Sequence, residues 1–494
     1  MRLLLDHGAN GDAYDNCGNS ALHFAASKGH LETARLLLER EADINSQDKE
    51  GLTPLQQVSR GMRKGYLDIM RLLLDYGANV DAYDNCGNSA LHFAASKGHL
   101  ETARLLLERG ADINSQDKEG LTPLQQVSRG MRKGYLDIMR FLLDHGANVD
   151  ACDNCGNTAL HFATSKGHLE TARLLLERGA DINSHNKEGL TPLQQASRGM
   201  RKGYLDIMHL LLDYRANVDA RDNCGNTALH FATSKGRIET VRMLLERGAG
   251  VNSQNDMGLT PLQRASQGGF LVNIEPVRLL DNEPVADVDF QSDQGLTRSR
   301  RRRPGLSRIR VKYLGIMRLL MDHGADVNVH DHSGNTALHF VASNCYLKAA
   351  RILLERKVEV DSQNSHGSTS LLVASEHGTP DLVQLFLDHD ADVYACDADG
   401  DTVLHRAAIA GRVEICRLLL KFDVEVNSRN NRGLTPLHLA SAGYEEGKLY
   451  LVRLFLNHGA DAQARDLSGK TPSEVARGPR RDEIVQILLQ YTAK

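Results

Sequence analysis

A pattern of 33 residues, repeated in register along nearly the whole chain, limits what this sequence can fold into. The clearest copy is Asp153 to His185, DNCGNTALHFATSKGHLETARLLLERGADINSH. This period is typical of a turn followed by two short antiparallel helices. One such unit cannot bury its own apolar face, so its leucines must pack against neighbouring units. The pattern therefore predicts a stack of repeats, in which the 494 residues set the number of repeats rather than the number of globular domains.

Each repeat carries its own start and stop signals. In the copy above, Thr158 is expected to cap a helix that runs to about Lys166, and Gly167 to end it. A second helix is expected over residues 169–178, ended by Gly179 in a left-handed conformation. Residues with side chains at the Gly179 position should cost about 1–2 kcal/mol each if they keep that conformation. These residues are Glu41, Arg215, Lys357, Asp390 and Asp423.

The motifs of this repeat resemble those of the ankyrin repeat. The resemblance lies in the T-A-L-H-x-A opening at Thr158, the G-H-L after the first helix, the L-L-L of the second helix and the G-A-D-x-N tail. The T-P-L-H form itself occurs at Thr435. The resemblance implies an all-α solenoid of stacked helix-turn-helix units with projecting turns or hairpins. It also implies a non-catalytic scaffold that binds proteins through its concave face, formed by the turn tips and first helices.

The register of the repeats divides the chain into five parts. They are a partial repeat at 1–14, regular repeats of alternately 33 and 36 residues at 15–254, two degenerate repeats at 255–330 with an arginine-rich insertion at 298–312, regular repeats at 331–465, and a capping repeat at 466–494. The chain opens inside a second helix, which predicts that an upstream segment is missing. The near-identity of the copies in the second part indicates recent duplication rather than functional constraint.

Two kinds of basic segment interrupt the pattern. The longer repeats carry RGMRKGY between their helices, interpreted either as a solvated loop or as a ladder of charges for an extended acidic partner. The arginine-rich insertion should stay unfolded because its charges repel one another. It is interpreted as a solvent-exposed loop, a nuclear-import or acidic-partner patch, or a sequence artefact. The residues concerned are Arg60, Arg63, Lys64, Arg129, Arg132, Lys133, Arg198, Arg201 and Lys202 in the loops, and Arg300, Arg301, Arg302 and Arg303 in the nuclear-import patch.

The residue types suited to catalysis or metal binding recur with the repeat, which favours structural roles. One histidine occupies the same place in many first helices, where the resemblance implies a bond to the preceding turn. Cys17 and its counterparts recur every second repeat, too far apart for disulfides, so free thiols are expected. Cys152 and Cys155 form a single C-x-x-C without a second pair, and the Asp397–Asp401 turn departs from a calcium loop. The sequence therefore predicts no enzyme activity, no metal and no cofactor.

Charge and apolar runs define the expected partners and location. The 59 basic and 63 acidic residues nearly balance, which argues against nucleic acid; a local attraction through residues 298–312 remains a third alternative. No apolar run reaches the roughly 20 residues that span a bilayer. Scattered cysteines and the lack of a signal peptide favour the cytoplasm, with the nucleus as the alternative, and we expect a monomer.

The resemblance also selects candidate partner-binding residues at the turn tips and first helices. They are Asn85, Cys86, Asn88, Lys118, Glu119, Leu121, Asn154, Cys155, Asn157, Ser165, Lys166, His185, Lys187, Glu188 and Leu190. The leading interpretation is a scaffold that binds other proteins, whose identity the sequence does not specify. The alternative is the regulatory region of a larger enzyme or signalling protein whose N-terminal domain is missing.

Overall fold

The computed structural model describes residues 3, 6–61, 65–130, 134–199, 203–267, 304–443, 447–478 and 481–492, with the backbone alone for 304–311 and 492. Across these residues the regular secondary structure is helical, apart from one isolated β-bridge between Cys396 and Thr402. The all-α prediction is confirmed. The chain divides into two compact bodies, an N-terminal body of residues 1–223 and a C-terminal body of residues 224–494.

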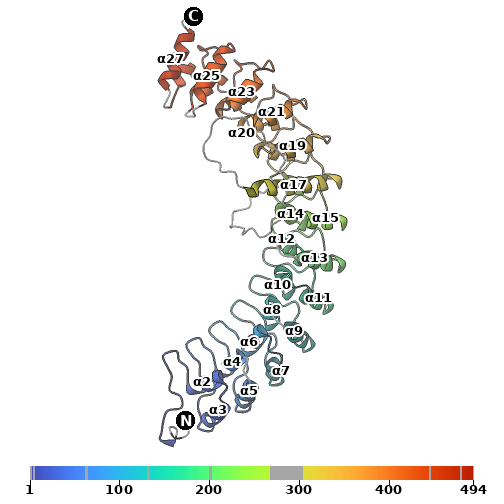
Figure 1. Ribbon diagram of the computed structural model, residues 1–494, viewed down its shortest axis with the longest axis vertical. Helices are drawn as coiled ribbons and strands as arrows, with labels where there is room; N and C mark the ends of the chain where they lie inside the picture. The colour runs from blue at the N-terminus through green and yellow to red at the C-terminus, as the bar shows by residue number, and fades with distance from the viewer. Residues whose placement is uncertain are drawn as a thin grey trace. The chain divides into compact units, whose positions relative to one another are not determined.

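The N-terminal body is built from pairs of short helices. The pairs are α2 (Ala21–Lys28) with α3 (Leu31–Leu38), α4 (Pro54–Ser59) with α5 (Tyr66–Asp75), α6 (Ala90–Lys97) with α7 (Leu100–Glu108), α8 (Pro123–Arg129) with α9 (Tyr135–Asp144), α10 (Ala159–Lys166) with α11 (Leu169–Glu177), and α12 (Pro192–Arg198) with α13 (Tyr204–Asp213). First helices pack on first helices and second helices on second helices, giving the two layers visible in Figure 1. The predicted stacking of helix-turn-helix units is confirmed.

The C-terminal body continues the same arrangement. Its helices are α14 (Ala228–Ser234), α15 (Ile238–Glu246), α16 (Pro261–Ser266), α17 (Pro304–Asp322), α18 (Ala337–Ser343), α19 (Leu347–Leu354), α20 (Ser370–His377), α21 (Pro380–Leu387), α22 (Val403–Ile409), α23 (Val413–Leu419), α24 (Pro436–Ser441), α25 (Lys448–Asn457), α26 (Pro472–Val475) and α27 (Arg481–Thr492). Within this body each first helix packs against its own second helix and against the neighbouring first helices.

Local signals position each helix as the sequence predicts. The Thr158 hydroxyl accepts the amide of His161 at 3.4 Å, which caps α10. The next residue after α10 is Gly167, in the left-handed region with φ 81°. Helix α11 ends at Glu177, one residue before the predicted end, and Gly179 has φ 84°. The apolar side chains between these caps are buried between adjacent repeats. This packing stabilises the helices, because a pair of helices this short is only marginally stable alone in water.

Four of the five predicted left-handed residues are found in that conformation. Glu41, Arg215, Asp390 and Asp423 have φ values of 58°, 65°, 59° and 53°. The prediction is wrong for Lys357, whose φ is not positive. There the amide of residue 358 bonds the carbonyl of residue 356 at 2.8 Å, so the chain leaves the helix through a different, tighter turn.

Arg215→Gly should stabilise the protein by roughly 0.5–1 kcal/mol, because relief of the left-handed backbone outweighs the added flexibility of the unfolded chain. Glycine already occupies this position at residues 110 and 179, with φ near the value of Arg215. Urea denaturation would measure the change. Lys357→Gly is the matched control, since that site has no such strain to relieve, and we expect it to be neutral or destabilising. A gain from Lys357→Gly equal to that from Arg215→Gly would contradict this explanation.

Residues 255–330, for which two degenerate repeats are predicted, contain the described helices α16 and α17. Helix α16 packs against α17 as a first helix packs against its second helix, although 37 residues separate them in sequence. The Gln263 amide donates to the carbonyl of Val329 at 2.8 Å, and the Tyr313 hydroxyl donates to Ser234 at 2.8 Å. The equivalent bonds hold the regular repeats together. The second helix predicted to begin near Pro276 lies outside the described residues.

The arginine-rich insertion predicted to be unfolded is helical in its C-terminal part. Helix α17 begins at Pro304 and therefore includes residues 304–312. Proline is well suited to a first turn, and the buried residues Tyr313, Ile316 and Met317 anchor the helix to the core. The free energy gained by burying this apolar face is larger than the repulsion between the arginine charges, on which the prediction of an unfolded segment depended. Residues 298–303 lie outside the described part of the chain.

Candidate functional site

The turn tips of successive repeats are joined by backbone hydrogen bonds, one at each step. The Lys118 amide donates to the Cys86 carbonyl at 2.9 Å, and the Lys187 amide to the Cys155 carbonyl at 2.9 Å. In the C-terminal body the same bond runs from Ala398 to His366 at 2.8 Å and from Asn431 to Asp399 at 2.9 Å. Within each body the tips therefore form a fixed row, and the side chains they carry are held at regular intervals.

Several candidate partner-binding residues shape this row instead of projecting from it. The Asn154 side chain donates to the Lys118 carbonyl at 2.8 Å. The Asn157 amide donates to the Asp153 carboxylate at 2.7 Å, and the Asn157 side-chain oxygen accepts from Asn186 at 3.0 Å. The same roles fall to Asn85 and Asn88. These asparagines fix the tip conformation, and sequence reasoning missed that role.

The structure contradicts the placement of two leucines among the partner contacts. Leu121 and Leu190 are each 1% exposed and lie in the core between repeats. Each directly precedes a helix-capping threonine, so its side chain points inward where the chain enters the first helix. Its carbonyl accepts a hydrogen bond from a histidine of the preceding repeat, His92 at 2.8 Å or His161 at 2.9 Å.

The remaining candidates stand on the surface. Ser165 is half-buried, and its carbonyl accepts the Tyr204 hydroxyl at 2.6 Å. The exposed candidates are Cys86, Lys118, Glu119, Cys155, Lys166, His185, Lys187 and Glu188. All eight cysteines are free thiols, including Cys152 and Cys155 of the C-x-x-C. The tips of the N-terminal body therefore alternate between an exposed thiol and an exposed lysine-glutamate pair.

The arginines that begin the RGMRKGY segments are already engaged within the repeat stack. Arg60 lies over the Phe93 ring of the next first helix, 5.3 Å from its centroid, and 3.5 Å from the Glu50 carboxylate. Arg129 repeats this arrangement with Phe162 at 5.5 Å and Glu119 at 3.6 Å. Arg198 is 3.5 Å from Glu188. Each of these charges is thus compensated by a tip glutamate. The other loop candidates, Arg63, Lys64, Arg132, Lys133, Arg201 and Lys202, and the patch Arg300, Arg301, Arg302 and Arg303, lie outside the described residues.

The recurring histidines join neighbouring repeats, which confirms their structural interpretation. His161 accepts the Thr158 amide at Nδ1, 3.2 Å away, and its Nε2 lies 2.9 Å from the Leu190 carbonyl of the next repeat. This requires the neutral tautomer with a proton on Nε2. Burial lowers the pKa of His161 from its ordinary value, which maintains that neutral form. The equivalent residues are His23, His92, His230, His339, His405 and His438.

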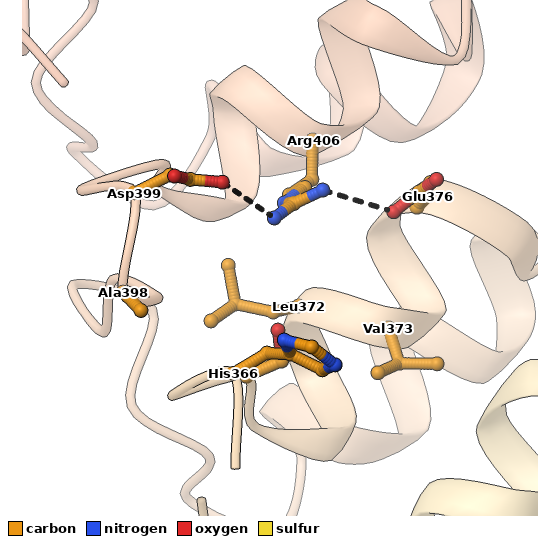
Figure 2. A pocket seen from close by; sticks show the side chains of 8 residues that line it. His366, Leu372, Val373, Glu376, Ala398, Asp399 and Arg406 are labelled. Atoms are coloured by element: carbon orange, nitrogen blue, oxygen red, sulfur yellow. Dashed lines mark ion pairs between the residues drawn. The ribbon is translucent and has the colours of Figure 1, made fainter. Parts of the chain in front are cut away.

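One departure from the repeat pattern opens a pocket in the C-terminal body. Val373 of α20 stands where other first helices carry Phe93, Phe162 or Phe340, and the smaller side chain leaves space beside it. The pocket has a volume of about 350 Å³. Its lining comes from two consecutive tips and two first helices, namely His366, Ser368, Leu372, Val373, Glu376, Ala398, Asp399 and Arg406 (Figure 2).

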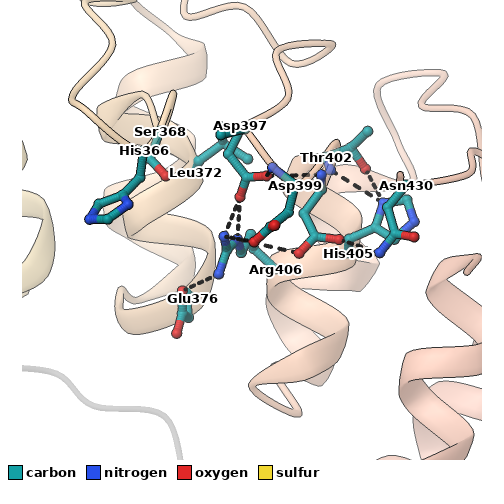
Figure 3. Close-up of polar contacts among 12 residues, drawn as sticks. His366, Ser368, Leu372, Glu376, Asp397, Asp399, Thr402, His405, Arg406 and Asn430 are labelled. Atoms are coloured by element: carbon teal, nitrogen blue, oxygen red, sulfur yellow. Dashed lines mark hydrogen bonds and ion pairs between the residues drawn. The ribbon is translucent and has the colours of Figure 1, made fainter. Parts of the chain in front are cut away.

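Arg406 of α22 lies at the centre of a group of four carboxylates beside this pocket (Figure 3). Its Nε donates to Asp397 at 2.6 Å, and its Nη2 also pairs with that carboxylate. The guanidinium is further 3.5 Å from Glu376, 3.7 Å from Asp401 and 4.0 Å from Asp399. The Asp397 and Asp401 side chains are 1% and 2% exposed, so both depend on internal partners.

The aspartates of this tip could be mistaken for a metal site. One oxygen from each of Asp397, Asp399 and Asp401 lies within 4.8 Å of the others. However, the Arg406 guanidinium already supplies positive charge to this group, and the Asp397 carboxylate also accepts the amides of residues 399 and 401 at 3.0 Å each. Hydrogen bonds and an arginine thus account for the cluster. No described helix is long and apolar enough to cross a membrane.

Comparison with known proteins connects these features to a family. A family model described as ankyrin repeats in three copies matches residues 41–117, 111–186, 193–292, 309–397 and 371–452, and one described as ankyrin repeats in many copies matches residues 4–56. Among curated proteins, the chain is 48% identical over 61 residues to an E3 ubiquitin-protein ligase of Arabidopsis thaliana and 44% identical over 61 residues to a probable E3 ubiquitin-protein ligase of Oryza sativa subsp. japonica. It is 43% identical over 51 residues to an ankyrin repeat-containing protein of Schizosaccharomyces pombe. These matches cover 12%, 12% and 10% of this chain and 12%, 12% and 25% of the relatives.

Proposed function

Because the chain belongs to the ankyrin repeat proteins, we propose that it is a non-catalytic scaffold that binds partner proteins along its turn tips and first helices. The observation that supports this most directly is the hydrogen-bonded row of tips, which carries exposed lysine-glutamate pairs on a fixed backbone. A row held in place before binding loses little conformational entropy on association. The alternating charges can pair with a partner of complementary pattern and exclude others.

Reversing the tip charges tests this function in the full-length protein. The variant carries Lys118→Glu, Glu119→Lys, Lys187→Glu and Glu188→Lys, which leave the net charge and the backbone bonds unchanged. Proteins captured from a cell extract by wild-type protein should be captured about tenfold less by this variant, since like charges would face the partner. Quantitative mass spectrometry would measure the capture.

The control for this experiment places a matched reversal on the second helices. Arg140→Glu and Glu108→Lys change exposed residues of α9 and α7, away from the tips. This control should retain the wild-type set of captured proteins. If the tip variant, with unchanged melting temperature, captured the same proteins in the same amounts as wild type, partner binding through the tips would be excluded.

A second candidate function follows from the relatives. Two of them are named as E3 ubiquitin-protein ligases, and the chain covers only 12% of each. The repeats would then be the part of a larger enzyme that selects or regulates its substrate. Sequencing the transcript upstream of Met1 would test this. An in-frame stop codon close to Met1 argues for the scaffold, and an open reading frame that encodes a further domain argues for the larger enzyme.

A further inference from the structure

We propose that the pocket between α20 and α22 binds the side chain of an arginine or lysine presented by a partner protein. This inference rests on the proposed function, because it assigns one contact within the partner-binding surface. In register, the pocket residues Ala398 and Asp399 correspond to the tip positions Asn154 and Cys155, and Arg406 corresponds to the first-helix position Phe162. The pocket therefore lies on the surface where we propose that partners bind.

The charge of the pocket favours a cationic guest. Four carboxylates, from Asp397, Asp399, Asp401 and Glu376, lie around the single guanidinium of Arg406. Other side chains in the described part of this region can also carry positive charge. Arg412 directs its Nε to the main-chain carbonyl of Glu376 at 2.9 Å, and His377 Nε2 lies 3.7 Å from the Glu376 carboxylate. His366, which would be positive only when protonated, lines the pocket itself. Carboxylates thus outnumber the guanidinium groups, and the excess negative charge is concentrated at Glu376 and Asp399.

An anionic guest is disfavoured for the same reason. Arg406 would have to bind it, but the guanidinium already directs donors to Asp397 and lies within 4.0 Å of the other three carboxylates. A second anion brought to the open side of the guanidinium would be repelled by Asp399 and Glu376. A cation placed there is repelled by Arg406 but is attracted by Glu376 and Asp399 on either side, and the four carboxylates of the group outnumber this single guanidinium.

The shape of the pocket suits a long side chain with a charged end. Figure 2 shows Glu376 and Asp399 on opposite sides of Arg406, with Leu372 and Val373 below them. Methylene groups of arginine or lysine can cover Leu372 and Val373 while the charged group reaches the carboxylates. The volume of about 350 Å³ is within the range of roughly 300–1,000 Å³ typical of ligand pockets. Glu376 is part-buried and Asp399 is exposed, so a guest from solvent can reach both.

The test is a titration of full-length protein, with methyl-labelled leucine and valine, followed by NMR. The probe is N-acetyl-arginine amide, which carries one charge on its side chain, and the comparison is N-acetyl-citrulline amide, which has nearly the same shape without the charge. The Val373 methyl signals should shift with the arginine probe at millimolar concentration. The citrulline probe should bind at least about tenfold more weakly, because it lacks charge-assisted hydrogen bonds.

Variants connect this response to the pocket. Glu376→Gln with Asp399→Asn should weaken binding of the arginine probe at least about tenfold, whereas Glu414→Gln, at an exposed position of α23, should leave it unchanged. Equal responses to arginine and citrulline, no response at all, or a matching response to N-acetyl-glutamate amide would overturn the proposal. So would a response that appears only after Arg300, Arg301, Arg302 and Arg303 are replaced by serine, which would assign the pocket to the chain's own basic segment. The tip-charge experiment does not alter Glu376 or Asp399, so the two proposals can fail independently.

Discussion

The protein should lose stability as the pH falls below about 6.5, and replacing five buried histidines by glutamine should remove most of that loss. Burial lowers the pKa of His92, His161, His339, His405 and His438 from the ordinary value of 6.5. Between the lowered pKa values and pH 6.5, these histidines are therefore protonated in the unfolded chain and neutral in the folded chain. The stability from these residues is present above pH 6.5 and is lost as the pH falls through the lowered pKa values, by at most about 1.4 kcal/mol per pH unit for each histidine.

Glutamine is the informative replacement because the chain already uses it at the same position. Gln56 accepts the Thr53 amide at 2.8 Å and donates to the carbonyl of Asn88 in the next repeat at 2.8 Å, matching both histidine bonds. Thermal melting between pH 8 and pH 5 would compare wild type with the five-glutamine variant. His209→Gln, at an exposed histidine of α13, is the control and should keep the wild-type profile. Parallel pH profiles for wild type and the five-glutamine variant would exclude the histidines as the cause.

Lys448→Met should lower the free energy of unfolding by about 3 kcal/mol or more. The Lys448 side chain is 3% exposed, and its ammonium donates to the carbonyls of Ala408 at 2.6 Å, Ile409 at 2.7 Å and Leu439 at 3.3 Å. Methionine fills a similar volume but donates no hydrogen bond. The Ala408 carbonyl keeps a hydrogen bond from the Gly411 amide at 3.2 Å. Each of the other carbonyls left without a donor costs about 1–3 kcal/mol. Chemical denaturation would measure the loss, and amide exchange should locate it at α22 and α25.

The chain also supplies the control for this substitution. Lys448 stands where the longer repeats carry Tyr66, Tyr135 and Tyr204. The Tyr66 hydroxyl donates to the Ser27 carbonyl at 2.7 Å, which is the counterpart of the bond from Lys448 to Ile409. Lys448→Tyr should therefore retain most of the stability that Lys448→Met loses. If both variants destabilised the protein equally, volume rather than hydrogen bonding would be the cause.

Much of the fold could be predicted because the sequence signals that start and end each helix lie close to that helix in the chain. The threonine caps, the glycines that end helices and the period of 33 residues depend on neighbours a few positions away in sequence. Four of the five left-handed residues follow from that register alone. The exception at Lys357 has no explanation in the adjacent sequence, because Asp423 is followed by the same Val-Glu-Val and still has a φ of 53°.

The features that escaped prediction depend on contacts between repeats. The packing of α16 against α17 joins two helices that lie far apart in the sequence. Three of the four carboxylates beside Arg406 come from the Asp397–Asp401 tip, which the sequence does mark, but Glu376 comes from the preceding first helix, so no local motif predicts the group around Arg406. Leu121 and Leu190 were misplaced because a turn motif alone does not say which of its side chains faces the next repeat. Arg406 and Val373 stand where other first helices carry phenylalanine, and that difference in the sequence could have indicated the pocket.

The packing of α16 against α17 has a consequence for protein engineering. The two helices meet in the usual way although the sequence between them is far longer than in any other described pair. Closing a longer loop adds only about 0.6 kcal/mol for each doubling of its length, so packing of the flanking helices easily compensates. The connection between paired helices is thus a natural site for grafting. A fluorescent protein or an affinity tag inserted there, with flexible linkers, should leave the stack on either side folded.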